Sequence, residues 1–288
     1  MKRGSIIIAC SGGKHIGRSI ARKAKCDYAE LIADRFPDTE LKIRLPVDVK
    51  RKNVYFVQSF YPSEKDINDK LVEVLFAAYT AKELGARRVI LIAPYLAYLR
   101  EDKRFERGEA ISAKILRKLF RVFNRVYVVE PHLHRFRNFS QFFPNAIHIS
   151  LREEVAEYIK KNVKRDFILV GPDSESEQWV EPVAHKLKAR YIILSKKRFS
   201  ARKVKVSGKQ IKNEKAVIID DIISTGQTLI EASKLIKAKE VWFIGMHGLF
   251  SENALSKLRR KGKIVVSNSI PSSASKLDCS NILSQLIR

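Results

Sequence analysis

Short apolar runs rich in β-branched residues recur along the whole chain, and segments with helical periodicity lie between them. Such runs are typical of parallel strands that are buried on both faces. We expect strands over residues 5–10, 54–57, 89–93, 126–129, 167–170, 191–194, 216–219 and 241–244. We expect helices over residues 66–84, 112–123, 153–161, 177–188, 228–237 and 252–259. This alternation predicts an α/β fold with two mostly parallel sheets, each flanked by helices.

The length of the chain favours two domains. Its 288 residues exceed the size at which a single hydrophobic core usually stops growing, so two domains of about 140 residues are expected. The boundary is placed after Phe142-Phe143-Pro144-Asn145, which gives domains over residues 1–147 and 148–288.

The charge balance predicts anionic partners. The chain has 56 Lys and Arg residues against 31 Asp and Glu residues, a formal net charge of +25. A surface this positive attracts phosphates, either in nucleic acid or in small metabolites. Zinc-finger spacing, an RNP-type aromatic motif and a basic region linked to heptads are all missing from the sequence. Nucleic acid is therefore not the expected partner.

Hydropathy and cysteine content favour the cytoplasm. No apolar stretch approaches the roughly 18 to 20 residues that span a bilayer, so no membrane contact is expected. Cys10, Cys26 and Cys279 are widely spaced and form no CxxC pair. We expect reduced thiols and neither a disulfide framework nor a thiolate metal site.

The most specific stretch is residues 217–229, with the sequence VIIDDIISTGQTL. It predicts an apolar strand that ends in two carboxylates, Asp220 and Asp221, followed by a small-residue turn that opens a helix. Main-chain N–H groups of Ser224 to Thr228 could then enclose a phosphate, and the carboxylates could accept hydrogen bonds from sugar hydroxyls. The alternative is that these residues only cap a helix, although capping needs one such residue and not five.

This stretch resembles the ribose-5-phosphate loop of phosphoribosyltransferases and of ribose-phosphate diphosphokinases, the enzymes that make phosphoribosyl diphosphate (PRPP). Further motifs resemble those of the diphosphokinases, in the form found in archaea, and occur in the same order. They are RFPDTE at residues 35–40, PYLAYLREDKRF at 94–105, GEAISAK at 108–114, EPHLH at 130–134, GPDSESEQW at 171–179, KKR at 196–198 and HGLF at 247–250. The resemblance spans roughly residues 5–270 and implies two phosphoribosyltransferase-like domains.

The resemblance also implies an activity and its residues. The enzyme would transfer the diphosphoryl group of ATP to the 1-hydroxyl of ribose 5-phosphate, giving PRPP and AMP for nucleotide biosynthesis, with Mg²⁺ as cofactor. Lys196 and Arg198 would be catalytic, and His132 and Asp173 would hold the metal. ATP would contact Phe36, Asp38, Thr39, Glu40, Arg100, Glu101 and Asp102. Ribose 5-phosphate would contact Asp220, Asp221, Ser224, Thr225, Gly226, Gln227 and Thr228.

The chemical properties of these side chains support this activity independently of the resemblance. An arginine fork and a lysine point charge can follow negative charge as it moves during phosphoryl transfer. The alternative for Lys196 and Arg198 is a solvated basic loop, because eight of the residues from 196 to 212 are Lys or Arg. For Phe36 and Arg100, a core residue and a surface ion-pair partner are the alternatives. In the family, the loop that bears the phenylalanine reaches a neighbouring subunit, which implies at least a dimer.

Several positions depart from the family pattern. Thr39 stands where the family has Gly, Glu101 replaces Gln, Glu130 replaces Asp, and Gln227 replaces a common Gly. Residues 201–203 are Ala-Arg-Lys where Gly-Asp-Glu is frequent. At position 227 a glycine would allow a positive φ and a close approach to phosphate. These departures motivate a second hypothesis, a non-catalytic nucleotide-binding paralogue that regulates an active homologue, whereas retention of Lys196 and Arg198 favours the enzyme.

Overall fold

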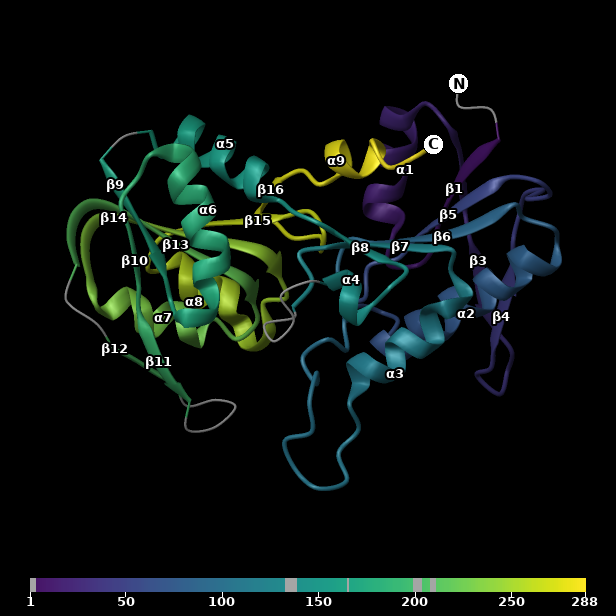
Figure 1. The fold of residues 1–288 in the computed structure, drawn as a ribbon, viewed down its shortest axis with the longest axis horizontal. Coiled ribbons are helices and arrows are strands. Elements are labelled where there is room, and N and C mark those ends of the chain that lie inside the picture. Colours follow the sequence, from purple (N-terminus) through teal and green to yellow (C-terminus); the bar gives the residue numbers. More distant parts are fainter. Residues whose placement is uncertain (1–3, 133–138, 165, 199–203, 208–210) are drawn as a thin grey trace. The chain divides into compact units, whose positions relative to one another are not determined.

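The computed structural model describes residues 4–132, 139–164, 166–198, 204–207 and 211–288, which form two compact units (Figure 1). Unit 1 comprises Met1–Ile149 and Cys279–Arg288, and unit 2 comprises Ser150–Asp278. The predicted second domain, 148–288, differs from unit 2 in its first two and its last ten residues. The last ten return to unit 1 because Cys279, Leu283 and Ile287 are fully buried there, where helix α9 (Ser280–Ser284) lies beside α1 (Lys14–Ala24).

Unit 1 is built on a six-stranded parallel sheet with the order β2-β1-β5-β6-β7-β8. Its strands are β1 (Ser5–Ala9), β2 (Asp27–Glu30), β5 (Asn53–Val57), β6 (Arg88–Ala93), β7 (Arg125–Val129) and β8 (Ala146–Ile149). Besides α1 and α9, its helices are α2 (Ile67–Glu83), α3 (Ser112–Leu119) and α4 (Phe139–Phe142).

Unit 2 repeats this topology with the strand order β10-β9-β13-β14-β15-β16, again parallel throughout. Its strands are β9 (Phe167–Gly171), β10 (Tyr191–Ile193), β13 (Ile211–Ile223), β14 (Ile236–Gly248), β15 (Lys263–Ser267) and β16 (Ser275–Leu277). Its helices are α5 (Arg152–Asn162), α6 (Glu177–Leu187), α7 (Gln227–Lys234) and α8 (Ala254–Arg259). The predicted fold class is confirmed in both units.

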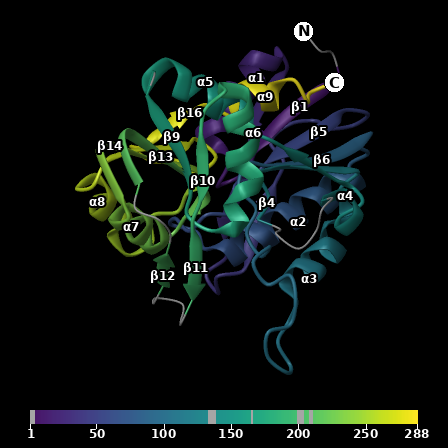
Figure 2. The same cartoon turned by 60° about the vertical axis from the view of Figure 1, so that its left-hand side comes forward.

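Each unit also has a two-stranded antiparallel hairpin outside its main sheet. In unit 1 it consists of β3 (Ile32–Arg35) and β4 (Leu41–Arg44). In unit 2 it consists of β11 (Ser195–Arg198) and β12 (Val204–Ser207), and Figure 2 shows this ribbon continuing from the end of β10.

The strand order fixes where each unit can bind a ligand. In both sheets the second strand pairs on one side of the first strand and the third pairs on the other, so the connections diverge between β1 and β5 and between β9 and β13. Open α/β sheets bind ligands at such switch points, outside the carboxyl ends of the strands. Among the described residues, no helix is long and apolar enough to cross a membrane.

Candidate active site

The carboxyl end of β13 carries the two aspartates at the switch point of unit 2. Asp220 is half-buried, whereas Asp221 is buried. The Asp221 main-chain N–H donates to Oδ1 of Asp220 at 3.0 Å, and the Ile222 N–H donates to Oδ1 of Asp221 at 2.7 Å. These bonds fix both carboxylates at the sheet edge, as the sequence predicts.

The turn after β13 leads directly into α7. Gly226 has φ 72°, in the left-handed region that glycine adopts without strain, and a Cβ there would lie 3.0 Å from a methyl group of Leu258. The next residues begin the helix, and N–H groups in the first turn of a helix are suited to binding an anion. Ser224, Thr225 and Thr228 are half-buried around this first turn. The structure thus has the glycine turn and the helix start that the sequence predicts here, and phosphate binding stays a prediction.

Gln227 does not disturb this turn, because the positive φ falls at Gly226 and Gln227 is the first helical residue. Its side-chain amide donates to Oε1 of Glu231 at 2.8 Å, and Lys234 contacts the same oxygen at 2.7 Å. The side chain therefore lies along α7. The departure from the family pattern leaves the conformation of the turn intact.

Asp173 approaches the same switch point from β9. It caps the 3₁₀ turn Ser174–Ser176, where its Oδ1 accepts from the Ser176 N–H at 3.1 Å. The preceding Gly171 leaves space for this turn, because a Cβ there would meet the Ser176 hydroxyl at 2.3 Å. The side chain of Asp173 is buried. Asp173 follows the end of β9, and Asp220 and Asp221 lie near the end of the neighbouring strand β13.

His247, which the sequence singles out only as part of the HGLF motif, lies next to the aspartates of β13 in the strand register. It lies on β14 opposite Ile222 of β13, is buried, and its Nδ1 lies 2.7 Å from the hydroxyl of Ser269. That hydroxyl is in turn 2.7 Å from Ser267. The strand register was the missing information, because it aligns His247 with the residue that follows Asp221.

Lys196 and Arg198 are placed by their main chain on β11. They are two residues apart and therefore share a face of the strand, opposite Val206 and Val204 of β12. β12 lies beside α7, the helix that begins at the phosphate loop. Their side chains lie outside the described part of the structure, as do residues 201–203.

In unit 1 the proposed ATP residues Phe36, Asp38, Thr39 and Glu40 form the exposed connection between β3 and β4. The Phe36 ring is 46% exposed and lies under the Lys42 ammonium group, 5.5 Å from it. Thr39 has φ 75°, an unfavourable value for a β-branched residue, at the position where the family has glycine. The hairpin therefore exposes one aromatic face and two carboxylates to solvent.

Arg100, Glu101 and Asp102 lie on the long connection from β6 to α3. Arg100 and Glu101 are exposed, whereas Asp102 is buried. The Glu109 carboxylate accepts hydrogen bonds from the N–H groups of Phe105 and Glu106, at 2.8 and 2.7 Å. The connection is therefore folded on itself, with Arg100 and Glu101 turned to solvent.

His132 is half-buried just beyond β7. Glu130, which replaces the family's aspartate, is buried with φ 37°, and its Oε2 lies 2.9 Å from Nε2 of His148 on β8. The longer carboxylate thus contacts a neighbouring strand. Within the described ranges, no group of three or more His, Cys, Asp or Glu side chains forms a metal cage.

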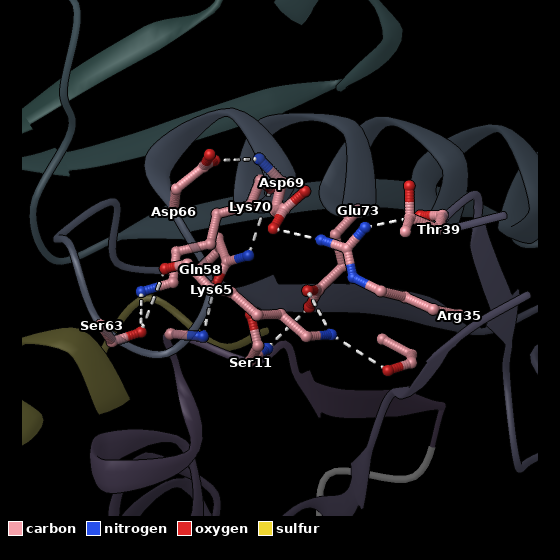
Figure 3. Close-up of polar contacts among 12 residues, drawn as sticks. Ser11, Arg35, Thr39, Gln58, Ser63, Lys65, Asp66, Asp69, Lys70 and Glu73 are labelled. Atoms are coloured by element: carbon pink, nitrogen blue, oxygen red, sulfur yellow. Dashed lines mark hydrogen bonds and ion pairs between the residues drawn. The ribbon is translucent and has the colours of Figure 1, made fainter. Parts of the chain in front are cut away.

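Polar side chains lie close to the main chain that follows β1 (Figure 3). The N–H groups of Ser11 and Gly12, after β1, donate to Glu73 and Gln58 at 2.7 Å each. Glu73 and Gln58 are fully buried. These two N–H groups are therefore satisfied by side chains of the protein itself.

Lys70, on the same helix as Glu73, is also fully buried. Its ammonium group donates to the Tyr61 carbonyl at 2.5 Å and to the Ser63 hydroxyl at 2.9 Å. Burial lowers the pKa of Lys70 to about 8, against the opposing effect of Glu73. This lysine therefore holds the loop that precedes α2.

Comparison with known proteins identifies the family. Residues 5–123 match the N-terminal domain of ribose phosphate pyrophosphokinase, and residues 145–278 match the phosphoribosyl transferase domain. The ribose-phosphate pyrophosphokinase of Methanopyrus kandleri is 30% identical over 94% of both chains, and that of Saccharolobus solfataricus is 34% identical over 89% of both. The fold matches a phosphoribosylpyrophosphate synthetase from Mycobacterium smegmatis with a TM-score of 0.84, at 23% identity, over 98% of this chain and 97% of that one. The chain belongs to the ribose-phosphate pyrophosphokinase family of enzymes.

Proposed function

We propose that the protein transfers the diphosphoryl group of ATP to ribose 5-phosphate, forming PRPP and AMP. The main support is the edge of unit 2, where Asp220, Asp221 and the turn into α7 combine sugar-binding carboxylates with a phosphate-binding helix end. The relatives that carry the name ribose-phosphate pyrophosphokinase match along nearly the whole chain. This likeness favours synthesis over consumption of PRPP.

In the proposed reaction, the 1-hydroxyl oxygen of ribose 5-phosphate forms a bond to the β-phosphorus of ATP. The bond from that phosphorus to the α-phosphate oxygen breaks, AMP leaves, and the hydroxyl proton is released. Such a step depends on alignment and on positive charge around the phosphorus. We assign alignment of the sugar to Asp220, Asp221 and the 224–228 turn, and charge stabilisation to Lys196 and Arg198.

We assign ATP to the groups of unit 1. Phe36 would stack on the base, Asp38 and Glu40 would accept hydrogen bonds from the nucleoside, and Arg100 would contact the polyphosphate. Thr39, Glu101 and Asp102 belong to the same two segments. The exposure of Phe36 and Arg100 supports this assignment, because a core phenylalanine would be buried.

Mg²⁺ is the proposed cofactor, with Asp173 and His132 as its protein ligands. Mg²⁺ usually keeps several waters and binds through one or two carboxylates plus substrate phosphates, so it needs no complete protein cage. Asp173 of unit 2 offers a buried carboxylate, which suits Mg²⁺, whereas the imidazole of His132 in unit 1 is an unusual ligand for this ion. When bound, the ion would neutralise charge on the triphosphate.

A homo-oligomer, at least a dimer, completes the proposal, and the cytoplasm is the expected location. Helix α2 exposes large apolar side chains at helical spacing, Val72, Phe76 and Tyr79, of which Tyr79 is 62% exposed. Grouped apolar side chains on a surface often mark a protein contact. This stripe supports a second copy of the chain as the partner.

The deciding experiment measures AMP and PRPP after the protein is mixed with ATP, ribose 5-phosphate and Mg²⁺. Lys196→Ala should lower kcat roughly 100- to 1000-fold, the usual cost of removing one contact to the transition state, and should change ATP affinity far less. Wild-type protein that binds ATP but forms no PRPP would favour the non-catalytic paralogue. If Lys196→Ala changes only the affinity for ATP, the result would support the alternative that residues 196–212 are a solvated basic loop.

A further inference from the structure

The β3–β4 hairpin needs support from outside itself. Its two strands form a separate sheet, and a two-stranded hairpin alone is marginally stable in water. Its turn is closed by two main-chain bonds, from Phe36 N–H to Glu40 O and from Thr39 N–H to Phe36 O, each 2.9 Å. The left-handed Thr39 opposes this closure. A fixed direction for Phe36 therefore requires another contact.

Asp69 of helix α2 supplies that contact by pairing with Arg35 of β3 (Figure 3). One guanidinium nitrogen, Nη2, lies 2.5 Å from Oδ2 of Asp69, and the other, Nη1, donates to the Thr39 carbonyl at 2.5 Å. A single planar group thus joins the helix to the turn. The side chain of Asp69 is 24% exposed and that of Arg35 is 40% exposed, so solvent screens this pair only in part.

A second contact fixes the other half of β3. The Lys65 ammonium group donates to the Ala33 carbonyl at 3.0 Å and lies 3.5 Å from Oε2 of Glu73. Glu73 is itself held in the core by the Ser11 N–H. β3 is therefore attached to the body of unit 1 at Ala33 and at Arg35, just before the turn begins.

We propose that Arg35 and Asp69 are positioning residues for the nucleotide, which fix the 36–40 turn before ATP arrives. The proposal rests on the assignment of Phe36 and Asp38 to ATP. A turn that is ordered in advance loses less conformational entropy on binding, so the clamp strengthens ATP affinity without touching the reacting atoms. Glu73 and Lys65 hold the base of the same hairpin.

The test replaces Asp69 by Asn in the full chain, which removes the charge and keeps the shape. We expect the Kd of ATP, measured by calorimetry with Mg²⁺ and without ribose 5-phosphate, to rise roughly three- to ten-fold, as for a partly screened ion pair. At saturating ATP, kcat should stay within about two-fold of the wild type. Asp69→Glu, which keeps the carboxylate, should recover most of the affinity.

Glu83→Gln is the matched control, because it removes the same charge from the exposed end of α2. Hydrogen exchange supplies a readout that needs no activity: Asp69→Asn should speed exchange at residues 36–40, whereas Glu83→Gln should not. Unchanged exchange there, or equal changes in ATP affinity for both variants, would overturn the clamp. Wild-type protein without PRPP synthesis would refute the proposed function, while ATP affinity and exchange would still decide the clamp. Faster exchange without a change in ATP affinity would refute a role in nucleotide positioning.

Discussion

At the scale of single residues, the two aspartates of β13 differ in environment although they are neighbours in sequence. Asp221 is buried, and Asp220 is half-buried. Replacing both by Asn should weaken ribose 5-phosphate binding far more than ATP binding in calorimetry, because each charge-assisted hydrogen bond contributes about 1.5 to 3 kcal/mol. Asp166→Asn, an exposed site that precedes β9, is the control. Equal weakening of both ligands would contradict the assignment.

Lys70 should make stability depend on pH. Its pKa in the folded protein, about 8, lies below the ordinary value of 10.5, because burial disfavours the charged ammonium group. Between these values the unfolded chain binds more protons than the folded one, so this group makes the free energy of unfolding rise from about pH 8 to pH 10.5. Denaturant titrations over that range should show a smaller rise for Lys70→Met than for the wild type. An equal rise in both would assign the dependence to other groups.

Some features of the candidate site could be predicted from the sequence, and others could not. The Asp220-Asp221 pair and the 224–228 turn were predictable because an apolar strand, two carboxylates and a glycine turn have local consequences. The effect of Gln227 on the turn could not be predicted, because only the structure assigns the positive φ to Gly226. Nor could the pairing of Arg35 with Asp69 be predicted, because it joins residues 34 positions apart.

At the scale of elements, the short α9 holds the end of the described chain onto unit 1. Lys23 donates to the Ser280 hydroxyl at 2.6 Å, and the Arg288 N–H donates to the Tyr55 hydroxyl at 3.0 Å. Leu283 is fully buried. Leu283→Ala should destabilise unit 1 by about 2 to 5 kcal/mol, the usual cost of emptying a buried leucine site.

Hydrogen exchange should locate this effect. Leu283→Ala should speed exchange in β1 and β5 and leave β9 and β13 unchanged, whereas Leu258→Ala, a buried site in unit 2, should do the reverse. Faster exchange in β13 after Leu283→Ala would show instead that the segment supports unit 2.

The predicted apolar runs formed strands, whereas the strands β2, β8 and β15 were not predicted. All eight predicted runs are strands, because continuous β-branched segments fit few environments other than a covered sheet. Helix α1, which was not predicted, has four cationic residues, Lys14, Arg18, Arg22 and Lys23, and these obscure its apolar face. The predicted helix 228–237 is too long, since β14 begins at Ile236.

At the scale of the whole molecule, the proposed oligomer predicts that activity depends on concentration. If the stripe of Val72, Phe76 and Tyr79 contacts a second copy, the sedimenting mass and the specific activity should fall together on dilution. Phe76→Lys should move this transition to higher protein concentration, whereas Lys82→Ala, on the same helix, should change it little. A monomer with full activity would refute a shared site.

The return of residues 279–288 to unit 1 also bears on the order in which the protein can fold during synthesis. Domains generally fold as units while the ribosome adds residues from the N-terminal end. Here the segment that covers α1 is made only after all of unit 2. All residues of unit 2 are therefore synthesised before unit 1 is complete. Until then, the surface of unit 1 that Leu283 and Ile287 later cover is exposed, and chaperones or other chains can bind it.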